Sequence, residues 1–134
     1  MNDTTQDQSP SQPAILHVCK REMVLPLRDE ILRLSGYRVN STLSAREALA
    51  MSSARPYDLV LVDVEGEGGI GEAEQLCSAI KSATSDQLVA FVCNWRVATL
   101  TDCPDEIIRA EFNPAAFVAG VRKVLANNHT AALN

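Results

Sequence analysis

Residues 58–63 read DLVLVD, and this stretch decides the predicted fold. Its middle is a continuous apolar run, which the carboxylate of Asp63 closes. A strand that is apolar on both faces is typical of the centre of a parallel sheet, where helices cover each side. The stretch therefore predicts a central parallel strand with Asp63 at its carboxyl end.

Four other short segments are predicted to be strands. Residues 88–93 form a second continuous apolar run, and residues 15–19 form a compact run near the start of the folded part. Residues 37–41 alternate in polarity like an edge strand, and the two isoleucines at 107–108 mark a short last strand.

Segments with helical spacing separate these strands. Within residues 24–35, Leu27, Ile31 and Leu34 recur at i, i+4 and i+7, which places them on one face of a helix. Residues 44–47 read SARE, the S-x-x-E form in which a serine and a glutamate satisfy each other's free backbone N–H groups. This form predicts the start of a second helix.

Two more helices are predicted after the central strand. The apolar face of the first consists of Ala73, Leu76, Cys77 and Ile80. The second begins at Asn113 and Pro114, which supply an N-cap and a first-turn proline. Its apolar face consists of Phe117, Val121 and Leu125.

This alternation of strands and helices predicts an α/β fold, a three-layer sandwich around a five-stranded parallel sheet. Right-handed crossovers leave few topologies, and the flavodoxin-like order 2-1-3-4-5 is common at this size. The carboxyl ends of strands one, three and four converge in such a sheet. We therefore expect Cys19, Lys20, Asp63 and Cys93 to lie near one another, with Asp63 at the centre of the site.

The length of 134 residues predicts one domain. Residues 1–13 hold no large apolar side chain beyond Met1 and are expected to be a disordered leader, residues 14–125 the folded body and residues 126–134 a flexible tail. The net charge of -5 argues against a nucleic-acid partner and an anionic membrane surface. No apolar run approaches the roughly 18 residues of a membrane span.

The cysteines are far apart in the sequence and form no C-x-x-C motif: Cys19, Cys77, Cys93 and Cys103. A zinc site is therefore not expected, and reduced, mostly buried thiols in a cytoplasmic protein are the favoured interpretation. Oxidation of Cys19 or Cys93 next to a cation is the alternative.

Five segments in this order resemble a response-regulator receiver domain of the CheY-like superfamily. They are ILHVCKR at 15–21, LSGYRV at 34–39, S-x-x-EAL at 44–49, YDLVLVD at 57–63 and FNPAAFVAGVRKVL at 112–125. Gly71 also stands eight residues after Asp63, where receivers carry a glycine that closes the loop. The resemblance implies a stand-alone domain of two-component phosphorelay signalling, with Asp63 as the position that accepts a phosphoryl group from a histidine kinase.

The positions that assist phosphorylation in receivers depart from the family pattern. The pair of acids that holds magnesium falls on Cys19 and Lys20, and the lysine after strand five falls on Ala110. No hydroxyl follows Cys93, and the aromatic switch position falls on Ile107. A thiol beside an ammonium offers no oxygen ligands for magnesium. These departures favour a pseudo-receiver with no cofactor and no enzymatic activity, which acts by binding a protein.

Several alternatives stay open. Lys20 is a candidate to pair with Asp63 in place of a metal, although the alignment allows a shift by one residue. A conventional receiver phosphorylated on Asp63 is the second candidate function, and a small flavodoxin-like ligand-binding protein or enzyme is the third. Glu65 and Glu67, assisted by Glu22, are candidates for a metal site, whereas a solvated acidic loop is the simpler interpretation.

The expected partner is a histidine kinase or another signalling protein, and the resemblance also implies a homodimer. The single tryptophan, Trp95, is a candidate for the contact with a partner or for packing over the region of the fourth helix.

Overall fold

The computed structural model describes residues 12–66, 68–93, 102–110 and 113–133, with side chains as far as residue 127. Its sheet is entirely parallel and has the order β2-β1-β3-β4-β5, which confirms the predicted topology. The strands are β1 (Ala14–Val18), β2 (Arg38–Thr42), β3 (Leu59–Asp63), β4 (Val89–Cys93) and β5 (Glu106–Arg109). The predicted leader, residues 1–13, lies outside the described residues except for Gln12 and Pro13.

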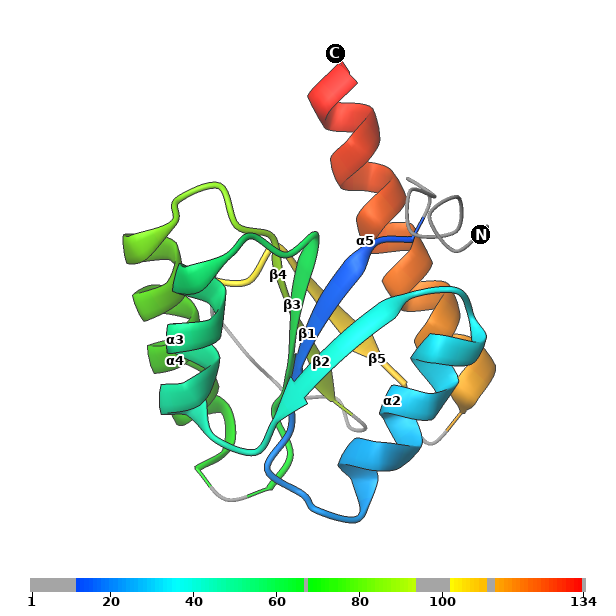
Figure 1. Ribbon diagram of the computed structural model, residues 1–134, viewed down its shortest axis with the longest axis horizontal. Coiled ribbons are helices and arrows are strands. Elements are labelled where there is room, and N and C mark those ends of the chain that lie inside the picture. Colours follow the sequence, from blue (N-terminus) through cyan, green and yellow to red (C-terminus); the bar gives the residue numbers. More distant parts are fainter. Residues whose placement is uncertain (1–11, 67, 94–101, 111–112, 134) are drawn as a thin grey trace, which may run out of the picture.

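Helices cover both faces of the sheet (Figure 1). They are α2 (Val24–Leu34), α3 (Ala45–Ala54), α4 (Gly69–Ala83) and α5 (Pro114–Leu133). α3 and α4 lie on one face, and α2 and α5 lie on the other. The result is the predicted three-layer sandwich.

The side chains of β3 alternate between the two halves of the core. Val60 and Val62 pack with the helices α3 and α4, while Leu59 and Leu61 pack on the face covered by α2 and α5. The period of two along a strand places Asp63 on the same face as Leu59 and Leu61. The acid therefore faces α2 and α5 at the carboxyl edge of the sheet.

The buried face of α2 differs from the one that its leucine spacing suggests. Leu27 and Leu34 are 66% and 79% exposed, and the buried residues of this helix are Arg28, Asp29 and Leu32. The helix itself is confirmed, but it turns two charged residues toward the sheet. Both charges have partners there, so burial does not leave either one uncompensated.

The helix ends follow the predicted capping only in part. Asn113 accepts a hydrogen bond from the backbone N–H of Ala116 at 3.1 Å, as expected for an N-cap. Ser44 likewise accepts one from the N–H of Glu47 at 3.1 Å, but the carboxylate of Glu47 is bound by the hydroxyl of Thr42 instead of returning to Ser44. The reciprocal half of the capping box is therefore replaced by Thr42.

Two further boundaries differ from the predictions. α5 runs to Leu133, so the stretch expected to be a tail after Leu125 continues the helix. The stretch at 126–133 contains alanines, which favour helix, and it contains neither glycine nor proline. Gly71, expected to close the loop after Asp63, lies inside α4, and the left-handed residue before that helix is Gly68.

Substitution by alanine is expected to change the stability in opposite directions at two glycines inside helices. A Cβ at Gly71 would meet no atom within 4 Å, whereas one at Gly120 would lie 2.5 Å from Cγ2 of Ile108. Gly71→Ala should raise the free energy of unfolding by roughly 0.5–1 kcal/mol through helix propensity. Gly120→Ala should lower the free energy of unfolding by about 1 kcal/mol, because the cost of overpacking against Ile108 exceeds the gain in helix propensity. Urea denaturation checks both, and equal stability of the two variants would contradict the packing of α5 on β5.

A polar network is buried between β1, β2 and α2. Nδ1 of His17 donates to Oδ1 of Asp29 at 2.8 Å, and the hydroxyl of Ser41 donates to Oδ2 at 2.6 Å. His17 is fully buried, and its Nε2 has no partner among the described residues. Burial by itself would raise the pKa of Asp29, but the hydrogen bonds from His17 and Ser41 outweigh it and hold the pKa below 3.8.

This network predicts a loss of stability in acid. Because the pKa of Asp29 is lower in the folded chain than in the unfolded chain, its contribution is complete above the unfolded value near 3.8. The contribution decreases as the pH falls from there through the folded pKa. Denaturation midpoints measured from pH 6 down to pH 2 should fall for the wild type and fall less for Asp29→Asn. Parallel profiles would contradict the prediction.

Candidate functional site

Asp63 is held by two arginines at the carboxyl edge of the sheet. Nε and Nη2 of Arg21 donate to Oδ2 and Oδ1 at 2.9 and 2.8 Å, which is a bidentate pair. Nη1 of Arg28 donates to Oδ1 at 2.7 Å. The Asp63 side chain is fully buried beneath them.

Local structure places both arginines against the acid. Arg21 lies in the turn between β1 and α2, and its carbonyl oxygen accepts the backbone N–H groups of Val24 and Leu25 at 3.0 Å each. Arg28 follows in the body of α2, on the face that the helix turns to the sheet, and its guanidinium lies 5.4 Å from the centre of the Phe117 ring. The two arginines therefore approach Asp63 from the turn and from the helix.

The charge of Asp63 affects the pKa values of two neighbours, Arg21 and Cys19. Burial by itself would lower the pKa of Arg21, but the hydrogen bonds and the charge of Asp63 outweigh it and raise that pKa. Cys19 lies with its sulfur 3.7 Å from Oδ2 of Asp63. Burial, together with the charge of Asp63, raises the pKa of Cys19 against the opposing effects of a hydrogen bond with the Arg21 backbone and of the charges of Arg28 and Arg21. The thiol is thus neutral, which makes it a poor nucleophile.

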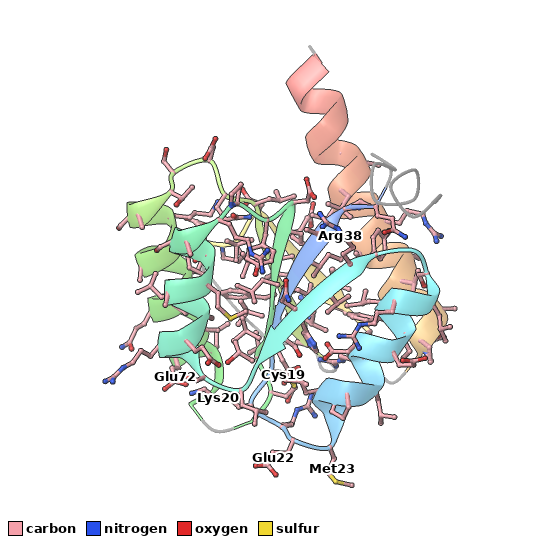
Figure 2. The ribbon with its side chains drawn as sticks, viewed as in Figure 1. Cys19, Lys20, Glu22, Met23, Arg38 and Glu72 are labelled. Atoms are coloured by element: carbon pink, nitrogen blue, oxygen red, sulfur yellow. The ribbon has the colours of Figure 1, made fainter. Side chains whose placement is uncertain are left out.

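Lys20 pairs with another acid than the one that it was a candidate to neutralise. It forms an ion pair with Glu72 in the first turn of α4, as the neighbouring labels in Figure 2 show. The salt bridge considered for Lys20 is therefore formed by the next residue, Arg21, together with Arg28. Lys20 and Asp63 still line the same small cavity, together with Glu72.

Two of the other predicted site residues, Cys93 and Ala110, lie along the same edge. The N–H of Ala110 donates to the carbonyl of Cys93 at 3.0 Å, so the ends of β4 and β5 meet there. Cys93 is buried, and Nη1 of Arg109 lies 3.9 Å from its sulfur. Ile107, partly buried, packs against the core on the side of α3 and α4. Trp95 lies outside the described residues.

The residues present do not fit a magnesium ion. A carboxylate offers about four lone-pair positions, and the donors at Asp63 are three guanidinium N–H groups and the nearby thiol of Cys19. The guanidinium groups thus cover the carboxylate, and the side chains of Cys19 and Lys20 supply no hard oxygen ligands. Within the described ranges, no group of three histidine, cysteine or acidic residues could hold a metal ion.

The acidic residues of the neighbouring loops are dispersed. Glu22 points outward from the turn after β1, next to Met23 (Figure 2). Glu65 is close enough for its charge to raise the pKa of Arg21, and Glu67 lies outside the described residues. The described residues thus do not form the acidic metal site that was considered from the sequence.

Sequence reasoning missed Arg21 and Arg28 as site residues. Arg21 follows directly after the positions aligned with the acid pair, so the possible shift of that alignment by one residue was the available signal. Arg28 has no comparable signal, because an arginine in an amphipathic helix is ordinarily assigned to the solvent face.

The described part of the chain has no helix that is long and apolar enough to cross a membrane. No family model matches the sequence, and no curated protein matches it.

Solved structures resemble this chain in fold. A CheY-like receiver domain from Methanospirillum hungatei JF-1 superposes with a TM-score of 0.76 at 21% identity, over 90% of this chain and 99% of that one. The response regulator TrrA from Thermotoga maritima, solved with magnesium and beryllofluoride, gives 0.72 at 24% identity over 84% and 99%. The chemotaxis response regulator CheY4 of Vibrio cholerae gives 0.72 at 17% identity over 85% and 99%. The chain therefore has the fold of CheY-like response-regulator receiver domains.

Proposed function

We propose that this chain, which has the receiver-domain fold, is a receiver-like signalling module that acts through a protein partner without phosphorylation of Asp63. One observation carries the proposal: Arg21 and Arg28 occupy both carboxylate oxygens of the acid at the acceptor position. The module belongs to the pseudo-receiver class, and its setting is a cytoplasmic two-component pathway.

The chemistry of phosphoryl transfer supports this proposal. A carboxylate that attacks a phosphoryl group needs a lone pair directed at phosphorus, and it needs cations that neutralise the incoming oxygens. At Asp63 the cations instead neutralise the resting carboxylate. An attack would require breaking the bidentate contact with Arg21, whose side chain is 27% exposed, and the contact with Arg28, whose side chain is 10% exposed. The ion pairs thus oppose the first step.

The carboxyl edge of this chain contrasts with what is known of TrrA. That response regulator was solved with magnesium and beryllofluoride. In this chain the corresponding carboxyl edge presents the thiol of Cys19, an ammonium paired with Glu72, and two guanidinium groups. We infer that the receiver fold is retained here for its surface and that the acid has become a structural residue.

Intact-mass spectrometry tests the proposal. The wild type and Asp63→Asn are incubated with magnesium and acetyl phosphate, beside a conventional receiver as positive control. We expect no phosphoryl adduct on either form of this chain. An adduct on the wild type that is absent from Asp63→Asn would overturn the proposal and establish the conventional phospho-accepting receiver.

Beryllofluoride gives a second readout that does not depend on a phosphodonor. Two-dimensional amide NMR spectra recorded with magnesium and beryllofluoride should match those recorded without them at Asp63 and Val64. The fluorescence of the single tryptophan should also stay unchanged when magnesium is added. Saturable shifts confined to the carboxyl edge of the sheet would contradict the proposal.

The protein partner remains a prediction, and the described surface offers one place to look for it. The exposed large apolar side chains include Met23, Leu27 and Leu34, which lie on α2 or directly before it. Exposed apolar side chains that gather in this way are a common mark of protein contacts. Whether the chain forms the expected homodimer is measured by sedimentation equilibrium.

A further inference from the structure

A cavity of about 180 Å³ opens beside the arginines, between α2, the end of β5 and the start of α5. Its walls are mostly apolar and include Val24, Leu27, Ile31, Ala110, Pro114 and Phe117, and Asn113 adds an uncharged polar side chain. A cavity of about 150 Å³ with walls of this kind accepts a molecule the size of benzene in another protein. The space is therefore sufficient for a small ring or a short aliphatic chain.

The charged residues that line the cavity are Arg21 and Arg28, and among residues 12–66, 68–93, 102–110 and 113–133 no acid lines it. Asp63 lies behind them and balances one of the two positive charges. Glu65, on the loop after β3, also acts on Arg21. The cavity thus presents positive charge beside an apolar space, and Arg28 is the more buried of its two arginines.

Arg28 is suited to bind a ligand through the same group that holds Asp63. The residue is 8% exposed, and Nη1 is the nitrogen that it commits to Oδ1 of Asp63. A guanidinium carries five N–H donors, so one such bond leaves donors for a second carboxylate. The ring of Phe117 beneath the guanidinium fixes its plane.

We propose that this cavity binds a small organic anion: a monocarboxylate with a compact apolar body. The carboxylate accepts hydrogen bonds from the guanidinium of Arg28, and the apolar body packs against Ile31 and Phe117. Inorganic phosphate fits less well, because it would leave the apolar walls without contacts. The inference does not depend on whether Asp63 is phosphorylated, since the cavity lies on the outer side of the arginines.

Titration with benzoate tests the proposal, with benzyl alcohol as the uncharged molecule of similar shape. Binding is followed by methyl NMR of Val24, Leu27 and Ile31 in the full chain. We expect benzoate to bind with a dissociation constant on the order of 1 mM, about tenfold tighter than benzyl alcohol. Equal affinity for the two, or no saturable shift with 20 mM benzoate, would overturn the proposal.

A matched pair of variants locates the site. Leu27→Glu adds a carboxylate at the cavity, and Leu34→Glu adds one at an exposed position of the same helix outside it. Neither change buries a charge, because the two leucines are 66% and 79% exposed. Leu27→Glu should weaken benzoate at least tenfold, and Leu34→Glu less than twofold. Equal weakening by both, or by neither, would place the ligand elsewhere and refute the assignment.

Discussion

Asp63→Ala is expected to lower the free energy of unfolding by roughly 3–5 kcal/mol. The substitution removes the shared partner of Arg21 and Arg28, and the Arg28 side chain is only 10% exposed. A buried guanidinium without a counterion retains the cost of its desolvation and loses the attraction that offsets it. Equilibrium denaturation in urea at pH 7 measures the loss.

Two control variants separate charge from packing. Arg28→Met added to Asp63→Ala removes the stranded cation and should recover more than half of the loss. Arg21→Ala should cost only about 1 kcal/mol, because the Arg21 side chain is 27% exposed and water replaces part of its contact. An Asp63→Ala protein within 1 kcal/mol of the wild type would show that the ion pairs are not structural. In that case the acid would be available for chemistry.

His17→Leu is expected to destabilise the protein by about 3 kcal/mol at pH 7. It removes the imidazole that pairs with Asp29, a residue that is 4% exposed and would keep one hydrogen bond, from the hydroxyl of Ser41, and the charge of Arg33. Burial without its main partner should raise the pKa of the Asp29 carboxyl above the unfolded value. The variant should therefore gain stability as the pH falls from 7 toward 4, whereas the wild type should not.

The matched control is the double variant His17→Leu/Asp29→Asn, in which no carboxylate is buried without its imidazole partner. Its stability should exceed that of His17→Leu at pH 7 and should vary little with pH. Ser41→Ala should cost about 1 kcal/mol, the usual contribution of one hydrogen bond. If His17→Leu and the double variant have the same pH profile, the buried carboxylate is not the cause of the loss.

The central strands could be predicted because the apolar pattern that marks each of them lies within one short segment. Residues 58–63 and 88–93 are apolar on both faces, and the central strands that form there, Leu59–Asp63 and Val89–Cys93, are buried at every position. The α4 face of Ala73, Leu76, Cys77 and Ile80 was also confirmed. In each case the apolar positions along one segment predict which of its faces is buried, whatever the segment packs against.

The face of α2 could not be predicted in the same way. Its spacing predicts the face of Leu27, Ile31 and Leu34, but periodicity takes no account of what each face of the helix meets in the fold. The buried face follows from partners far along the chain. Asp63 accepts Arg28, and His17 and Ser41 hold Asp29, so the face with two charges is the one that can be buried.

The amino-acid sequence by itself determined the order of strands and helices and the place of Asp63 at the carboxyl edge, because short-range polarity and capping settle both. Tertiary structure alone decided that Arg21 and Arg28, not Lys20, neutralise this acid, and that an apolar cavity lies beside them. An ion pair depends on the distance between side chains 35 and 42 residues apart in the chain. That distance is set only when α2 packs on the sheet.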